Sequence, residues 1–188
     1  MALFRVRPTR TDKTIADTVS EYTTPAAERA AEVLTWGADE HVLCALALGW
    51  WLYSRNKDAR QRRDSSHLLL TTVVTATLPH LLKTVFDQER PDRQTARGHL
   101  HGVPFSGKPL DAFPSGHAIH VGAIASAATV LPPAKRNVVW AVGGGLVLTR
   151  IVLLAHWMSD VVAGLAIGAL SERLLRLITG YGTNRAVR

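Results

Sequence analysis

Three short polar stretches interrupt the apolar parts of this 188-residue sequence, and their side chains suit the binding and transfer of a phosphoryl group. The stretches are Lys83 with Arg90-Pro91, then Pro114-Ser115-Gly116-His117, then Arg150 with His156 and Asp160. They supply three cations, two imidazoles, one carboxylate and a Ser-Gly turn that can present backbone N–H groups. Because this set can neutralise and transfer a phosphoryl group by itself, we expect neither a metal nor any other cofactor.

Lys83 and Arg90 are seven residues apart, so they share one face of a helix if that helix continues as far as Pro91, which would end it. Arginine offers a planar fork for phosphate oxygens, and lysine offers a point charge. As an alternative, both can be interfacial cations that reach lipid headgroups. Ser115 is expected to begin a helix as its N-cap, where free N–H groups favour an anion. Simple capping is the structural alternative.

His156 and Asp160 are four residues apart, which places them on one face of a helix. We expect the Asp160 carboxylate to accept a hydrogen bond from one imidazole nitrogen of His156 and to leave the other nitrogen free for attack. A purely structural pair at a helix start is the alternative. Arg150 lies within the apolar residues 138–155, where an unused charge at bilayer depth would cost about 2.5–3.5 kcal/mol. We therefore expect Arg150 to serve a function.

The composition predicts the elements that must position these residues. Apolar residues make up 47% of the chain, and the charged residues lie in blocks between apolar runs, which is typical of a multi-pass membrane protein. We expect five apolar helices at residues 42–53, 67–86, 116–131, 137–155 and 159–178. Residues 25–40 have the spacing of an amphipathic helix. The predicted fold is all-α, a multi-pass transmembrane helix bundle of five spanning helices plus an N-terminal amphipathic or sixth helix. We expect an arm at 1–24, one domain at 25–180 and a tail at 181–188.

Small residues recur at helical spacing in two of these helices. They are Gly164 and Gly168 in the last helix, and Ala118, Gly122 and Ser126 in the helix at 116–131. This pattern predicts close helix packing within the bundle, with dimerisation as the alternative.

The loop charges predict how the bundle is oriented. Lys and Arg gather at 54–65, at 132–137 and at the C-terminus, all on one side if the helices alternate, and this side is expected to be cytoplasmic. The loop at 87–114 has balanced charge and falls on the other side, together with the three polar stretches. We therefore expect an active site that faces the periplasm or exterior, in a cell inner (plasma) membrane. The same alternation places the 1–24 arm outside, which conflicts with its four basic residues.

Charge and cysteine content exclude two further classes. The net charge of +7 is carried mostly by loops and tails, which argues against nucleic acid as a partner. Cys44 is alone, so an intrachain disulfide or a cysteine-based metal site is impossible.

Taken in order, the three polar stretches resemble the signature of the type 2 phosphatidic acid phosphatase superfamily, which also includes vanadium haloperoxidases and bacterial acid phosphatases. The resemblance spans residues 83–160 with all spacings kept, and it departs at Thr149, where the pattern usually has Ser. It implies that His156 attacks phosphorus to form a phosphohistidine, that Asp160 holds the His156 tautomer, and that His117 protonates the leaving oxygen and then activates water. The phosphate-binding residues that it implies are Lys83, Arg90, Ser115, Gly116 and Arg150.

These inferences predict an integral membrane lipid phosphatase that hydrolyses a phosphomonoester or diphosphate on a lipid headgroup. Isoprenyl diphosphate is the first substrate expected, because small members of the family often recycle that carrier. Phosphatidic acid, phosphatidylglycerophosphate and a phosphorylated saccharide lipid stay open, as does the oligomeric state. The expected partners are the lipid phosphate and membrane lipids. Alternative classes are a soluble vanadate-dependent haloperoxidase, a lipid phosphotransferase and a non-catalytic scaffold. His99 and His101 are a separate metal-ligand candidate in the long loop.

Overall fold

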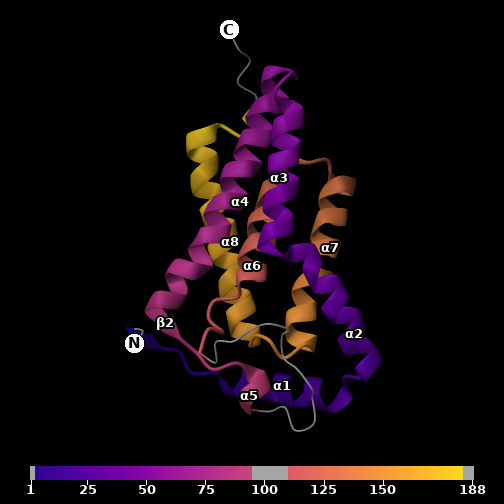
Figure 1. The fold of residues 1–188 in the computed structure, drawn as a ribbon, viewed down its shortest axis with the longest axis vertical. Coiled ribbons are helices and arrows are strands. Elements are labelled where there is room, and N and C mark those ends of the chain that lie inside the picture. Colours follow the sequence, from indigo (N-terminus) through magenta and orange to yellow (C-terminus); the bar gives the residue numbers. More distant parts are fainter. Residues whose placement is uncertain (1–2, 95–109, 184–188) are drawn as a thin grey trace.

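The computed structural model describes residues 3–94 and 110–183, and these form an almost entirely helical molecule (Figure 1). In chain order its elements are β1 (Phe4–Arg5), α1 (Arg10–Tyr22), α2 (Pro25–Leu34), the 3-10 turn η1 (Thr35–Ala38), α3 (Glu40–Ser54), α4 (Ala59–Val85), β2 (Phe86–Asp87), α5 (Pro91–Gln94), α6 (Gly116–Ala127), the 3-10 turn η2 (Ala128–Val130), α7 (Pro133–Val152) and α8 (Met158–Thr179). The predicted all-α architecture is confirmed.

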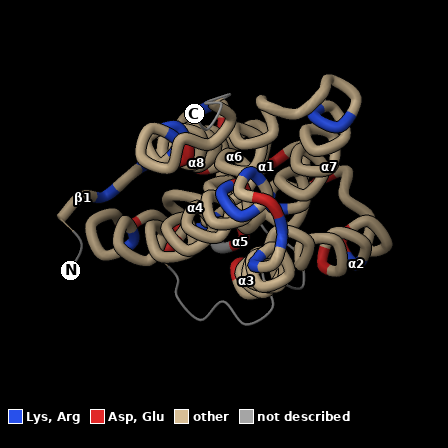
Figure 2. Tube along the Cα trace, turned by 90° about the horizontal axis from the view of Figure 1, so that it is seen from above, with Lys and Arg blue, Asp and Glu red and all other residues tan. Residues whose placement is uncertain are grey.

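Helices α3, α4, α6, α7 and α8 run along the long axis of the molecule, and α1 lies across one end together with β2 and α5 (Figure 1). We call this the α1 end. The opposite end holds the α3–α4 connection, and Figure 2, which looks onto it, shows Lys and Arg on that connection and at the start of α7. The α3–α4 connection and the start of α7 thus lie at the end opposite to β2 and α5, as the charge pattern predicts.

The observed helix boundaries differ from the predicted ones around α4. This helix begins at Ala59 because the Asp58 side chain caps it and accepts the Gln61 N–H at 2.8 Å. It ends at Val85, one residue before the predicted end, so the condition under which Lys83 and Arg90 would share a helix face is not met. Residues Phe86–Asp87 instead pair in parallel with Phe4–Arg5, and the two-residue strand takes the chain out of the helix before Arg90.

The N-terminal arm expected at residues 1–24 contains a helix that the sequence pattern did not predict. Thr9 and Asp12 form a capping box at the start of α1. The same Asp12 carboxylate accepts the backbone N–H and the hydroxyl of Ser159, both at 2.9 Å, and so ties α1 to the start of α8. Burial alone would raise the pKa of Asp12, but the hydrogen bonds from Ser159 and Thr9 outweigh it and lower that pKa.

Helices α6 and α8 form the tightest contact in the bundle. A Cβ atom built on Gly168 would lie 1.9 Å from the Ile119 carbonyl oxygen, and one on Gly122 would lie 2.2 Å from that of Leu165. Only glycine allows the two backbones to approach so closely. The small residues therefore pack within the bundle, as predicted, and fix the helix that carries His117 against the helix that carries Asp160.

A buried polar network joins α4, α6 and α8 near the opposite end. The Glu172 carboxylate, fully buried, accepts hydrogen bonds from Ser126 and from the Arg176 guanidinium, and it lies 3.1 Å from His67 Nε2. Tyr181 stacks on the His67 ring with a centroid separation of 4.2 Å, so the predicted tail begins with a packed residue. Residues 184–188 of that tail lie outside the described part of the chain. Every charge in this network has a partner, as burial of charge requires.

Apolar side chains cover the outward faces of the long helices. Large residues with more than a third of their surface exposed include Leu46, Leu52, Val73, Leu81, Val138, Val142, Leu148, Val162, Leu170, Leu174, Leu177 and Ile178. An exposed apolar surface that extends over α3, α4, α7 and α8 is typical of contact with a membrane. Among the described helices, α4 alone combines the length and the apolar composition of an independent membrane span.

Candidate active site

The structure brings the three predicted stretches together at the α1 end. Lys83 lies in the last turn of α4, Ser115 and His117 lie at the start of α6, and Arg150 lies in the last turn of α7. His156 follows α7, and Asp160 lies in the first turn of α8. Electrostatic interactions connect His156 with Lys83, Arg90 and Arg150. Side chains from four separate elements therefore lie near one another at this end of the bundle.

Asp111 holds two of the predicted phosphate-binding cations. Arg90 Nη2 and Nε donate to Asp111 Oδ1 at 2.8 and 2.9 Å, and Lys83 Nζ lies 3.7 Å from Oδ2. The Arg90 guanidinium also donates through Nη1 to the Ala155 carbonyl at 3.2 Å, which holds it beside the neighbouring His156. Lys83 and Arg90 therefore meet through a shared carboxylate and not through a common helix face. Sequence reasoning counted Asp111 only as a loop charge.

The segment around Asp111 also orients the predicted nucleophile. Gln88 and Asp111 form a parallel bridge, with Gln88 N–H to the Leu110 carbonyl and Ala112 N–H to the Gln88 carbonyl, both at 3.0 Å. The Ala112 carbonyl lies 2.7 Å from His156 Nδ1. Because a carbonyl can only accept, Nδ1 carries the proton and Nε2 keeps its lone pair. The segment at residues 111–112 thus holds Lys83 and Arg90 through Asp111 and fixes the tautomer of His156 through the Ala112 carbonyl.

The expected hydrogen bond between His156 and Asp160 is not formed. Asp160 Oδ2 lies 3.8 Å from His156 Nδ1, beyond hydrogen-bond distance, and accepts the backbone N–H of Trp157 at 2.9 Å instead. The prediction that Asp160 holds the His156 tautomer is therefore wrong, because the Ala112 carbonyl takes that place. The Asp160 carboxylate is fully buried and lies within ion-pair distance of the imidazole. Burial lowers the pKa of His156 well below its usual value, and the neighbouring Arg90 and Arg150 charges lower it further, so His156 is neutral at neutral pH.

Arg150 is buried and held by a residue outside the three stretches. Its Nη1 donates to the Thr35 hydroxyl at 2.9 Å, and 4% of the residue is exposed. Its Nε has no hydrogen-bond partner among the described residues. Just beyond Arg150 the chain makes a tight turn in which Leu154 adopts a φ of 49° and the Ala155 N–H bonds back to the Arg150 carbonyl at 3.0 Å. This turn links the position of Arg150 to that of His156.

The Pro-Ser-Gly-His stretch begins α6 as predicted. Ser115 is the N-cap, and its hydroxyl oxygen accepts the Ala118 N–H at 3.4 Å, while its own N–H donates to the Asp160 carbonyl at 3.3 Å. Gly116 follows as the first helical residue. Arg150 and Lys83, which lie near His156, also lie near enough to His117 to act on its charge, and a backbone hydrogen bond joins His117 to Thr35. The start of α6 thus brings a helix N-terminus, a hydroxyl and an imidazole to the site.

The described residues contain no group of three His, Cys, Asp or Glu side chains arranged to hold a metal ion. The separate candidate pair His99 and His101 lies outside the described part of the chain. Three cations beside a neutral imidazole, as Lys83, Arg90 and Arg150 lie around His156, form an arrangement that can bind a tetrahedral anion. Thr35, Ala112 and Asp111 complete the arrangement, and of these only Asp111 had a sequence signal, as a carboxylate three residues before Pro114.

A helical bundle with three cations around two imidazoles defines a class of phosphoryl-transfer proteins. Residues 64–183 match the family model of the PAP2 superfamily, and the chain belongs to this superfamily, as its three stretches predict. A relative from Rhizobium etli, named lipid A 1-phosphatase, is 32% identical over 81% of this chain and 72% of its own length. A second protein of that name, from Rhizobium johnstonii, is 38% identical over 60% of this chain, a match that spans 47% of the relative. The predicted phosphatase class agrees with both names.

Two solved structures share the fold. LpxE from Aquifex aeolicus has a TM-score of 0.68 at 15% identity, with 92% of this chain and 98% of that chain covered. A transmembrane PAP2-type phosphatidylglycerolphosphate phosphatase from Bacillus subtilis has a TM-score of 0.65 at 19% identity, with 94% and 88% covered. At these identities the likeness concerns the fold, and it identifies the helical bundle as that of membrane PAP2 proteins.

Proposed function

We propose that this protein is a membrane lipid phosphatase that hydrolyses a phosphoryl group from a lipid headgroup through a phosphohistidine on His156. The observation that carries the proposal is the convergence of Lys83, Arg90 and Arg150 around His156 at the α1 end. Three cations around one imidazole are more than packing needs, because each buried charge costs several kcal/mol unless it is compensated. Asp111 partners Lys83 and Arg90, whereas the described contact of Arg150 is with a neutral hydroxyl, and a tetrahedral anion would complete the compensation.

His156 Nε2 forms a bond to phosphorus while the bond between phosphorus and the lipid oxygen breaks. His117 takes up a proton when the bound anion offsets the neighbouring cations, and it gives this proton to the departing oxygen. Lys83, Arg90 and Arg150 neutralise the oxygens of the transferring group. In the second step His117 removes a proton from water, the water oxygen attacks phosphorus, and the bond to Nε2 breaks to release phosphate. The Ala112 carbonyl keeps the proton on Nδ1 throughout, and Asp160 stabilises the positive charge that develops on the ring.

We further propose that five long helices span the inner membrane, with the α1 end facing the periplasm or exterior. The exposed apolar surface and the basic residues at the opposite end support this orientation. For the substrate, a saccharide lipid 1-phosphate is favoured by the name of both relatives. Isoprenyl diphosphate, which was the first substrate expected from the sequence, is the second candidate. It is supported only by the observation that small members of the family often recycle that carrier.

The test is phosphate release by the purified protein from a panel of lipids in detergent micelles. The panel contains lipid A, isoprenyl diphosphate, phosphatidylglycerophosphate and phosphatidic acid, each assayed with and without chelator. We expect chelator-insensitive hydrolysis that vanadate inhibits and that His156→Ala abolishes. His41→Ala, whose side chain is 86% exposed, serves as the control and should keep full activity.

Either of two results would count against this proposal. Phosphate release that persists in His156→Ala removes the nucleophile, and activity that requires a divalent metal removes the metal-free mechanism. Transfer of phosphate to an added alcohol in preference to water would identify a phosphotransferase instead.

A further inference from the structure

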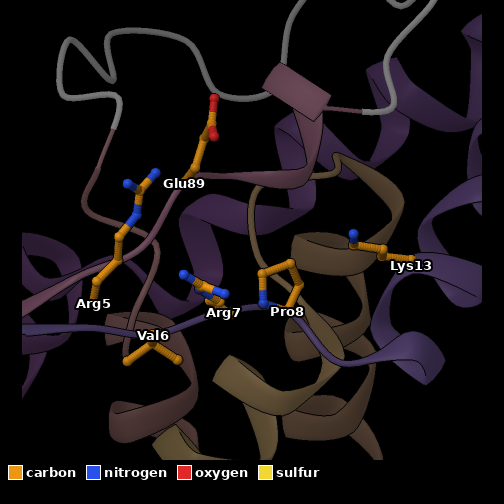
Figure 3. Close-up of a pocket in the computed structure, with 6 residues that line it drawn as sticks. All are labelled: Arg5, Val6, Arg7, Pro8, Lys13 and Glu89. Carbon is orange, nitrogen blue, oxygen red and sulfur yellow. The ribbon is translucent and has the colours of Figure 1, made fainter.

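A second basic cavity lies beside the active site, at the surface of the α1 end. It has a volume of about 350 Å³ and is lined by Arg5, Val6, Arg7, Pro8, Lys13 and Glu89 (Figure 3). The three cations are exposed, and among the described residues that line the cavity they face a single carboxylate. The proposed reaction uses none of these residues. The volume is about ten times that of one water molecule, so a phosphate or another anionic group fits inside with part of its headgroup.

The N-terminal segment that forms this cavity is attached to the bundle at both of its ends. Strand β1 pairs with β2, and the Val6 N–H extends the pairing by donating to the Asp87 carbonyl at 2.9 Å. After the cavity residues, the chain enters α1, where Asp12 bonds Ser159 at the start of α8. Arg7 and Lys13 are thus presented by a segment fixed between two attachments, which lowers the entropy cost of binding a ligand.

The cavity and the reaction site share a wall. Glu89 lines the cavity and is directly followed by Arg90, which lies among the phosphate-binding cations. The Glu89 carbonyl accepts a hydrogen bond from Trp157 Nε1 at 2.8 Å, and Trp157 directly follows His156. The cavity therefore adjoins the reaction site through Glu89, which precedes Arg90 and accepts a hydrogen bond from the residue that follows His156.

The charge of the cavity favours an anion. Of the acidic residues nearby, Asp12 is engaged by Ser159 and Thr9, and Asp87 lies in β2 opposite Arg5. Arginine forks suit phosphate and carboxylate oxygens, and at the outer interface these groups belong to lipid headgroups.

We propose that this cavity binds an anionic group of a lipid headgroup. This group is distinct from the phosphoryl group that is hydrolysed. Its source is either a second phosphate on the substrate or the phosphate of a neighbouring anionic lipid. The proposal rests on the proposed function, because it gives the hydrolysed lipid a second point of contact.

The test compares the variant R5Q/R7Q/K13Q with a control, K57Q/R60Q/K135Q, that removes the same charge from exposed cations at the opposite end. Both are assayed in nonionic micelles on a saccharide lipid with two phosphates and on its counterpart that lacks the distal phosphate. The counterpart is also assayed with phosphatidylglycerol added to the micelles. Equal melting temperatures establish that both variants are folded.

If the second phosphate of the substrate is bound, the cavity variant should raise KM about tenfold for the two-phosphate lipid and leave its kcat unchanged. Both KM and kcat for the one-phosphate lipid should stay at the wild-type values. If a neighbouring lipid is bound, the increase in KM appears for the one-phosphate lipid only when phosphatidylglycerol is present. Either increase should shrink at high salt. Equal KM values for the variant and the control on every substrate overturn the proposal.

Binding of the two-phosphate lipid to H156A, with and without the three cavity substitutions, separates this proposal from the proposed function. Loss of affinity in the substituted protein supports the cavity even if no lipid is hydrolysed. Affinity that is unchanged both without and with phosphatidylglycerol refutes it even if hydrolysis is rapid.

Discussion

Asp111→Asn is expected to tighten the binding of phosphate to the active site. In the structure the Asp111 carboxylate occupies the donors of Arg90 and lies near Lys83, where oxygens of a phosphoryl group are proposed to bind. An incoming phosphate must share these donors and also approach a negative charge. Asparagine keeps an oxygen that can accept from Arg90 and removes only the charge, so the guanidinium should stay in place.

The size of the effect follows from the geometry. An oxygen that replaces one Arg90 contact would lie about 5 Å from the remaining carboxylate charge, and two like charges at that separation repel by about 3 kcal/mol at an effective dielectric constant of about 20. The Asp111 side chain is 20% exposed, so solvent screening reduces this repulsion to about 1.5 kcal/mol. This corresponds to a decrease in the inhibition constant for phosphate of about tenfold.

The assay measures inhibition of lipid hydrolysis by inorganic phosphate and by vanadate in the wild type and in Asp111→Asn. Asp64→Asn is the matched control, because Asp64 also pairs with an arginine but lies in the first turns of α4 at the opposite end. The control should leave both inhibition constants unchanged. An unchanged or larger constant in Asp111→Asn, together with a collapse of kcat, would mean that the carboxylate serves only to position Arg90, and the competition argument would be refuted.

Three further changes test the site and the fold. Arg150→Lys keeps the charge but loses the planar fork, and we expect kcat/KM in the lipid assay to fall about 100-fold or more. The reason is that two charge-assisted hydrogen bonds, each worth about 1.5–3 kcal/mol, would be lost or weakened. A decrease of less than tenfold would argue against direct contact of Arg150 with the phosphoryl group. Gly168→Ala should prevent recovery of folded protein, as judged by size-exclusion elution, whereas Gly144→Ala, with nothing within 4 Å of its added methyl group, should be neutral or stabilising by about 1 kcal/mol. Because the folded state lowers the pKa of Asp12, its contribution to stability is present above the unfolded pKa near 3.8 and is lost as the pH falls through the folded value. Thermal unfolding of Asp12→Asn should therefore differ from wild type near pH 7 and converge with it in acid, while Asp17→Asn should match wild type throughout.

The helices and the reactive residues were accessible from sequence because both leave local patterns. Apolar runs of helical length predict the long helices, and the glycine spacing at Gly164 and Gly168 predicts the α6–α8 contact. The three polar stretches are recognisable because charges such as Arg150 are costly in apolar surroundings. Each of these signals is contained in a segment of about twenty residues or fewer.

The partners of the reactive residues were not accessible in the same way. The bonds of Asp111 to Arg90 and of Thr35 to Arg150 join residues that are 21 and 115 positions apart, and no periodicity records them. The capping box that starts α1 is visible in the sequence around Thr9, but its helix is too polar to produce an apolar run. The spacing of His156 and Asp160 was misleading, because a backbone carbonyl competes for the same imidazole proton.

The contact between α6 and α8 has a consequence for how a lipid reaches the site. Backbones that touch through glycine have no layer of side chains in which to slide or repack, so the two helices move as one body. His117 and Asp160 therefore keep a constant separation during turnover. Any opening that admits a bulky headgroup must then come from the other elements around the site, such as α1, which Asp12 and the buried Ala16 attach to the bundle, and η1.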